Sequence, residues 1–128
     1  MRYDPDVPPS ASQWLALDEA ARMAVVEQSH DASMPNVHLH AAIHAAVETQ
    51  IAMNLPSVVD AAARLRAQGL DRHDTIHAIG AVLAGHMWEM LRADTSAGDD
   101  PNVAYFAALD QLSAESWRRD YGASSGTD

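Results

Sequence analysis

The sequence predicts an all-α fold, a compact bundle of four longer helices and one short helix. Alanine, the best helix former, is frequent along the chain, and few runs of β-branched residues interrupt it. Apolar residues recur every three or four positions, which is typical of helices packed on one face. The 128 residues, 48% of them hydrophobic, suit a single domain. We expect a flexible arm over 1–10, the helical domain over 11–120 and a disordered tail over 121–128.

Capping and helix-breaking residues divide this domain. Asn36 and Asp71 are side chains that favour the start of a helix, and Gly69 is a residue that favours its end. Leu55 precedes Pro56, and a residue before proline avoids the helical region. The five expected helices run from Ser10 or Ser12 to about residue 30, over 37–54, from Pro56 or Ser57 to Gly69, over 72–93, and from Pro101 to about Arg119.

Charge and composition exclude several classes of function. The formal net charge is −10, from 18 acidic and 8 basic residues, so we expect neither nucleic acid nor a membrane surface as a partner. The sequence contains no cysteine, which excludes disulfides, thiolate ligands and cysteine nucleophiles. Its start lacks the apolar core of a signal peptide, and no apolar run reaches the ~20 residues of a membrane span. We therefore expect a cytoplasmic protein.

Two histidines follow the apolar stripe of the helix expected over 37–54. With about 100° of rotation per residue, His40 and His44 fall inside that stripe, and Glu48 falls at its edge. His38 falls about 160° from His40, on the face expected to meet solvent. This helix is therefore predicted to direct two imidazoles and one carboxylate toward the core.

The helix expected over 72–93 repeats the pattern. His73 and His77 lie inside its apolar stripe, and His86 lies outside it. Gly80 and Ala84 fall beside the first two, where small side chains leave room for a close partner helix or for a ligand. Each of the two helices thus carries a His-x3-His pair on its predicted inner face.

These inward-facing residues predict a metal site made of His40, His44, Glu48, His73 and His77. Side chains at positions i and i+4 of a helix lie one above the other and can converge on one ion. Imidazole is the commonest metal ligand near neutral pH, and the lack of thiolates and the few carboxylates favour a transition metal, iron or zinc first. Glu48, at the stripe edge, has the alternative role of orienting a ligand, and Arg72 is expected to pair with Glu48 or Asp74.

Three functions are consistent with this pattern. The first is a metal-binding protein, either an oxidoreductase or a hydrolase of unknown substrate. The second is a non-catalytic interaction module with a buried histidine network, expected to be a homodimer because Tyr105, Leu109 and Leu112 face away from the Phe106 and Trp117 side of the last helix. The third is a pocket for haem or another small molecule beside Gly80 and Ala84.

The residues also carry a family resemblance. The pattern His40-Ala-Ala-Ile-His44-Ala-Ala-Val-Glu48-Thr-Gln50, followed by Gly69-Leu70-Asp71-Arg72-His73-Asp74-Thr75-Ile76-His77-Ala78-Ile79-Gly80, resembles a family of short uncharacterised bacterial helical proteins. The resemblance covers roughly residues 14–92, and the family is a domain of unknown function. It implies a helical fold and no particular activity.

A second resemblance is one of spacing alone. His44-x3-Glu48 followed by His73-x3-His77 is similar to two ligand-bearing helices of hemerythrins, which hold two irons in a four-helix bundle. Hemerythrins also use a first-helix histidine and a last-helix His-x4-Asp, for which this chain offers His30 at a helix end and Asp110 without a histidine. The dipeptide His73-Asp74 resembles HD-type phosphohydrolases, whose surrounding pattern is absent.

Overall fold

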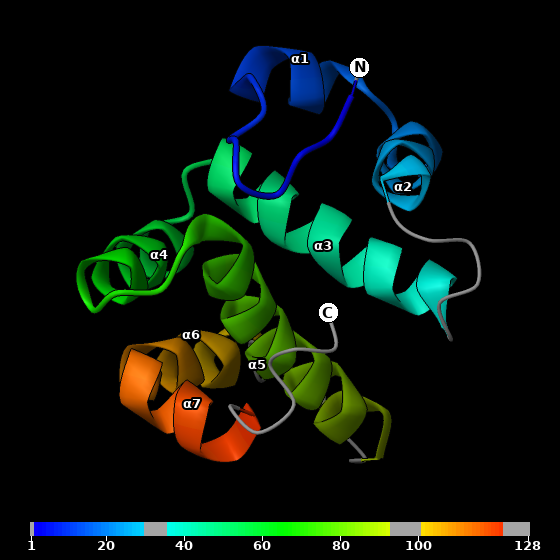
Figure 1. The fold of residues 1–128 in the computed structure, drawn as a ribbon. Helices are drawn as coiled ribbons and strands as arrows, with labels where there is room; N and C mark the ends of the chain where they lie inside the picture. The colour runs from blue at the N-terminus through cyan, green and yellow to red at the C-terminus, as the bar shows by residue number, and fades with distance from the viewer. Residues whose placement is uncertain (1, 30–35, 93–100, 122–128) are drawn as a thin grey trace.

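The structure is a computed structural model that describes residues 2–29, 36–92 and 101–121, and these form seven helices and no strand (Figure 1). The all-α prediction is confirmed. The division into four longer helices and one short helix is not, because the first and last predicted helices are each divided in two. The helices are α1 (Ala11–Ala16), α2 (Glu19–Gln28), α3 (Val37–Ala52), α4 (Pro56–Ala67), α5 (Arg72–Arg92), α6 (Pro101–Gln111) and α7 (Ala114–Tyr121).

The first division falls at Asp18. Ser10 caps α1 as expected, but Leu17 is extended, and the Asp18 side chain accepts a hydrogen bond of 2.8 Å from the backbone N–H of Ala21. An aspartate in this position satisfies an N–H that the start of a helix leaves without a partner. Asp18 therefore begins α2 instead of continuing α1.

The second division falls at Ser113. Its Oγ accepts a hydrogen bond from the N–H of Ser116, and its own N–H donates to the Ser116 Oγ, both at 3.0 Å. This reciprocal pair is the arrangement of a capping box, and it starts α7 with two residues between that helix and the end of α6. The last predicted helix is therefore divided at Ser113.

The central helix boundaries agree with the prediction. Pro56 occupies the first turn of α4, and Gly69, with a φ of 103°, ends that helix. The N–H groups of Gly69 and Leu70 donate to the carbonyls of Arg66 and Leu65, which is the hydrogen-bond pattern of a Schellman motif. Asp71 then caps α5 by accepting a hydrogen bond of 2.7 Å from the Asp74 N–H.

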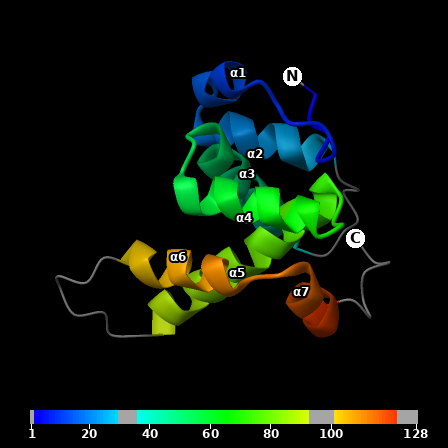
Figure 2. The ribbon, with the colours of Figure 1, turned by 90° about the vertical axis from the view of Figure 1, so that its left-hand side faces the viewer.

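The helices pack in two groups on either side of α3. In Figure 1, α1 and α2 lie on one side of α3, and α4, α5 and α6 lie on the other. In the view of Figure 2, α1 and α2 lie above α4, α5 and α6, and these last three helices contact one another. The α3–α5 contact is thus internal, and it joins the two helices that carry the histidine pairs.

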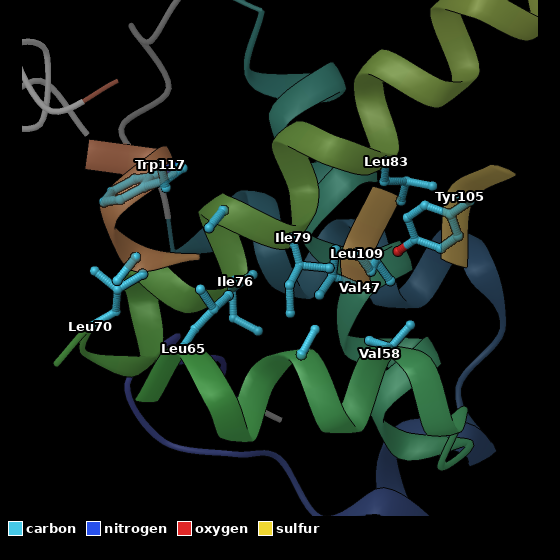
Figure 3. Close-up of a cluster of buried hydrophobic side chains, with 13 residues drawn as sticks. Val47, Val58, Leu65, Leu70, Ile76, Ile79, Leu83, Tyr105, Leu109 and Trp117 are labelled. Carbon is cyan, nitrogen blue, oxygen red and sulfur yellow. The ribbon is translucent and has the colours of Figure 1, made fainter. Parts of the chain in front are cut away.

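The larger core lies among α3, α4, α5, α6 and α7 (Figure 3). Tyr105 and Leu109 are buried in it, with exposed fractions of 2% and 0%, whereas Val103 is 64% exposed. The homodimer expectation relied on Tyr105 and Leu109 as a second apolar face of the last helix, and their burial inside the domain removes that support. This expectation treated residues 101–119 as one continuous helix, and the break at Ser113 removes the assumed alignment of Phe106 with Trp117.

Gly80 is a point of close approach between α3 and α5. A Cβ atom built on Gly80 would lie 2.7 Å from Cγ2 of Ile43. Of the two expectations for this small residue, the close partner helix is the one found, since Ile43 fills the space beside it. Ala84, one turn later, is exposed.

Some expectations fall on residues outside the described ranges. These are the end of the first helix at residues 30 and 31, the loop over 94–100, and residues 122–128 of the tail. Among the helices that are described, none combines the length and apolar character needed to cross a membrane.

Candidate metal centre

Four imidazoles gather where α3 and α5 meet. The His40 and His44 rings of α3 lie 4.6 Å apart between centroids, and the His73 and His77 rings of α5 lie 4.5 Å apart. Across the interface, the His77 ring lies 4.8 Å from that of His44 and 5.0 Å from that of His40. The two histidine pairs therefore face each other, as a shared site requires.

Three of these side chains meet the geometric condition for one ion. A ligand nitrogen from each of His40, His44 and His77 can be chosen so that all three lie within 4.8 Å of one another. His44 is buried at 1% exposure, whereas His40 and His77 are half-buried. The group thus has a closed side toward the core and a more open side toward the surface.

His73 lies beside the three. Its ring centroid is 5.7 Å from that of His44, and its Nε2 is buried without a hydrogen bond to any group in the described ranges. A buried polar atom without a hydrogen bond is costly, so such an atom points to an additional ligand or water. His73 therefore lies beside the three histidines that could share an ion but is not one of them.

Glu48 is placed one turn beyond His44 and is fully engaged by neighbouring side chains. Its Oε1 accepts a hydrogen bond of 2.7 Å from Nη2 of Arg72, and its Oε2 accepts one of 2.8 Å from Nη1. The Tyr3 hydroxyl donates a third hydrogen bond, of 2.6 Å, to Oε2. The expected pairing of Arg72 with Glu48 is thus confirmed, and the carboxylate lies next to the histidines in a salt bridge.

The Tyr3 hydroxyl connects Glu48 to His44. Its oxygen also lies 3.2 Å from Nδ1 of His44. Because Tyr3 has one hydroxyl proton and donates it to the carboxylate, the hydrogen bond with His44 requires Nδ1–H as the donor. The His44 lone pair is then on Nε2, which is buried.

Burial and charge act on both partners of Glu48. Burial of the Arg72 guanidinium acts to lower its pKa, but the hydrogen bonds and charge of Glu48 outweigh this effect and raise the pKa. Burial raises the pKa of Tyr3 far above its ordinary value of 10, and the Glu48 carboxylate adds to the increase. Arg72 therefore stays charged and Tyr3 stays neutral at physiological pH.

The N-terminal segment contributes more to this region than the sequence indicated. Tyr3 is 5% exposed and packs on Trp14, the Pro5 carbonyl accepts a hydrogen bond of 3.0 Å from Arg72, and an Asp6 carboxylate oxygen lies 3.3 Å from the His73 N–H. Helical periodicity gives no information on a non-helical segment, so the sequence alone predicts only an arm here. The single sequence signal for a role of this segment was a tyrosine, Tyr3, followed by Asp4, Pro5 and Asp6.

Two other histidines lie outside the cluster. His38 is on the solvent face of α3, with its side chain 82% exposed, and it contacts Glu27 of α2. His86 lies away from the cluster and stacks on Tyr105, with ring centroids 5.6 Å apart. Both are useful controls, since neither is among the three that could share an ion.

Comparisons with known proteins address the family of the chain. Searches of curated proteins and of solved structures gave no significant match. A family model described as "Domain of unknown function (DUF1841)" matches residues 14–113. This range contains all four clustered histidines, Glu48 and Arg72, but not Tyr3. The resemblance to a family of uncharacterised helical proteins is thus confirmed, and the chain belongs to the DUF1841 family.

Proposed function

We propose that this protein binds a single transition metal ion through His40, His44 and His77. The observation that supports this most is the convergence of three imidazole nitrogens from two helices, within 4.8 Å of one another. Zn–N bonds of about 2.05 Å in tetrahedral geometry set the nitrogens about 3.3 Å apart. Ring movements on the order of 1 Å would close the present arrangement around an ion.

The donor set favours zinc over iron. Iron in the common oxygenase sites binds two histidines and one carboxylate. Here the nearby carboxylate, Glu48, accepts hydrogen bonds from Arg72 and Tyr3, so the three converging donors are all neutral nitrogens. An all-imidazole set suits zinc, as in hydrolytic and hydration centres with three histidine ligands.

Three protein ligands leave a fourth coordination position on the ion. A zinc ion held this way lowers the pKa of its bound water to about 7 and polarises carbonyl or phosphoryl groups. His40 and His77 are half-buried, which gives a small substrate a route to that position. The buried Nε2 of His73 is suited to form a hydrogen bond with a water bound there. The site therefore fits Lewis-acid or hydrolytic chemistry.

Metal content of the untagged protein tests the proposal. A His-tag binds metals itself, so the chain is purified without one, incubated with zinc, desalted and analysed by inductively coupled plasma mass spectrometry. We expect about one zinc ion per chain and a fall in melting temperature after chelation, because an ion bound only to the folded state stabilises it. Zinc far below one per chain, with an unchanged melting temperature, would reject the proposal.

A buried histidine network without metal is the second candidate, and the close ring packing favours it. Four rings with neighbouring centroids 4.5–5.7 Å apart can stabilise the α3–α5 interface by packing alone. In that case His44→Ala would destabilise the protein equally with and without zinc. Under the metal proposal, zinc raises the melting temperature of the wild type and not that of His44→Ala. His38→Ala, on the same helix, is the control expected to behave like the wild type.

A further inference from the structure

The N-terminal segment, residues 2–6, contacts the metal centre at successive points. The Tyr3 hydroxyl bonds to Glu48 and His44, the Pro5 carbonyl accepts from Arg72, and an Asp6 oxygen accepts from the His73 N–H. The Tyr3 ring is buried with Trp14, Val26 and Ala45 in the second, smaller core. The segment therefore contacts both helices that carry the histidines, and it reaches the triad itself at His44.

We propose that Tyr3 is a positioning residue of the metal centre, and that docking of the segment 2–6 and metal binding strengthen each other. This inference rests on the proposed function. Tyr3 acts through His44: by donating to Glu48 and accepting from Nδ1–H, its hydroxyl keeps the lone pair of His44 on Nε2. A ligand histidine whose second nitrogen donates to an anchored acceptor is fixed in tautomer and ring orientation.

Glu48, which accepts the hydrogen bond from the Tyr3 hydroxyl, is itself held in place. Glu48 is 1% exposed and receives two hydrogen bonds from Arg72, which fix the orientation of its carboxylate plane. The order of contacts is thus Arg72 to Glu48, Glu48 to Tyr3, and Tyr3 to His44. Loss of the Tyr3 hydroxyl removes the hydrogen bonds to Glu48 and His44 and leaves the Arg72–Glu48 pair in place.

Coupling between the segment and the ion follows from linkage. If docked Tyr3 raises zinc affinity by some factor, then bound zinc must raise the docking equilibrium of the segment by the same factor. Hydrogen-bond partners of metal-ligating histidines typically contribute about 10- to 100-fold to metal affinity. We expect the same factor to appear as slower exchange of the amides that order the segment.

Zinc affinity of Tyr3→Phe tests the positioning role. The substitution keeps the ring that packs on Trp14 and removes only the hydroxyl. We expect about 10- to 100-fold weaker zinc binding by competition with a chelating dye. Tyr105→Phe is the matched control: it also removes a buried hydroxyl, whose hydrogen bond of 2.6 Å goes to Gln50, and we expect unchanged affinity. Equal affinity of Tyr3→Phe and the wild type would overturn the proposal.

The tautomer of His44 separates a positioning role of Tyr3 from a role in stability alone. Zinc binding by the wild type shows separately whether the metal site exists. Long-range ¹H–¹⁵N spectra of the metal-free chain should show His44 with its proton on Nδ1 in the wild type and a mixture of tautomers in Tyr3→Phe. A proton on Nε2 in the wild type would overturn the proposal even if zinc binds. Conversely, a wild type that binds no zinc rejects the metal centre, whatever the tautomer.

Hydrogen exchange tests the coupling. The Asp6 and Val7 amides donate to the side chain and carbonyl of Asp4, so their exchange reports the order of this segment. Zinc should slow their exchange by about 10-fold or more in the wild type, and by much less in Tyr3→Phe. Exchange that zinc leaves unchanged in a wild type that binds it would show that the segment and the ion are independent.

Discussion

Arg72 and Glu48 form a two-point salt bridge inside the domain, with Nη2–Oε1 and Nη1–Oε2 distances of 2.7 Å and 2.8 Å. The pair links the first turn of α5 to the fourth turn of α3, directly beside the histidine cluster. The Glu48 carboxylate has no contact with solvent to replace the guanidinium. The pair therefore fixes the relative position of the two helices next to the site.

Arg72→Met is expected to be strongly destabilising. Removal of one partner leaves the other charge buried without compensation, which typically costs about 3–5 kcal/mol. Urea unfolding measures this free energy. Arg92→Met is the matched control, because the Arg92–Glu89 pair is exposed, with a separation of 3.8 Å, and should change stability by less than about 0.5 kcal/mol. Similar losses in both variants would show that the buried pair is not the cause.

Gly80→Ala is expected to separate α3 from α5. The new methyl group would lie 2.7 Å from Cγ2 of Ile43, a branched side chain that cannot rotate away easily, and overpacking typically costs about 1–3 kcal/mol. Zinc affinity should fall as well, because the same interface holds the histidine pairs together. Thermal unfolding and zinc titration measure the two effects.

Gly85→Ala provides the control for that substitution. A Cβ at Gly85 meets nothing within 4 Å, so the better helix propensity of alanine should stabilise α5 by about 0.5–1 kcal/mol. Its zinc affinity should stay at the wild-type value. Equal stability of Gly80→Ala and Gly85→Ala would contradict the close contact of α3 and α5 at Gly80.

Tyr105 should make the protein sensitive to alkali. Burial raises the pKa of Tyr105 to about 12, although the hydrogen bond to Gln50 acts in the opposite direction. Between pH 10 and 12 the unfolded chain loses a proton that the folded chain keeps. The contribution of Tyr105 to the free energy of unfolding is fully present below about pH 10. Above that pH it falls by up to about 1.4 kcal/mol per pH unit.

Comparison of the wild type with Tyr105→Phe measures this contribution. Urea unfolding at about pH 9 and about pH 11 gives the pH dependence of the free energy of unfolding for each. The wild type should lose more stability over this interval, by about 1 kcal/mol, because phenylalanine does not titrate. Parallel pH profiles would contradict burial of a titrating hydroxyl at this position.

His73→Ala decides between an open and a closed metal site. If His73 only bonds to a metal-bound water, its loss should weaken zinc binding by no more than about 10- to 100-fold, the usual effect of groups beyond the ligands. The zinc-loaded variant should then show a changed pH profile in the hydrolysis of an activated ester. Loss of zinc affinity as large as that of His77→Ala would instead make His73 a fourth ligand and the site a closed, structural one.

Within each helix, the sequence was a good guide to the histidines. Rotation per residue relates His40 to His44 and His73 to His77, and the exclusion of His38 agrees with its 82% exposed side chain. Which helices are neighbours is a tertiary property that periodicity does not contain. The closest sequence signal was Gly80, whose missing side chain permits the α3–α5 contact.

Other features depend on competition that a helical wheel does not describe. Asp18 and Ser113 start new helices because their side chains satisfy backbone N–H groups, although the pattern around them continues. The face of α6 could not be assigned once that break was missed. Tyr3 lies in a segment without periodicity, so only the folded chain shows its position between Glu48 and His44.

The most direct test of the metal centre is a zinc titration by calorimetry of four untagged single variants beside the wild type. His40→Ala, His44→Ala and His77→Ala should each bind zinc more than about 100-fold more weakly than the wild type, which exceeds the usual effect of residues beyond the ligands. His38→Ala should bind about one ion with wild-type affinity. Equal zinc binding by all four variants, or none by the wild type, would contradict a metal centre at His40, His44 and His77.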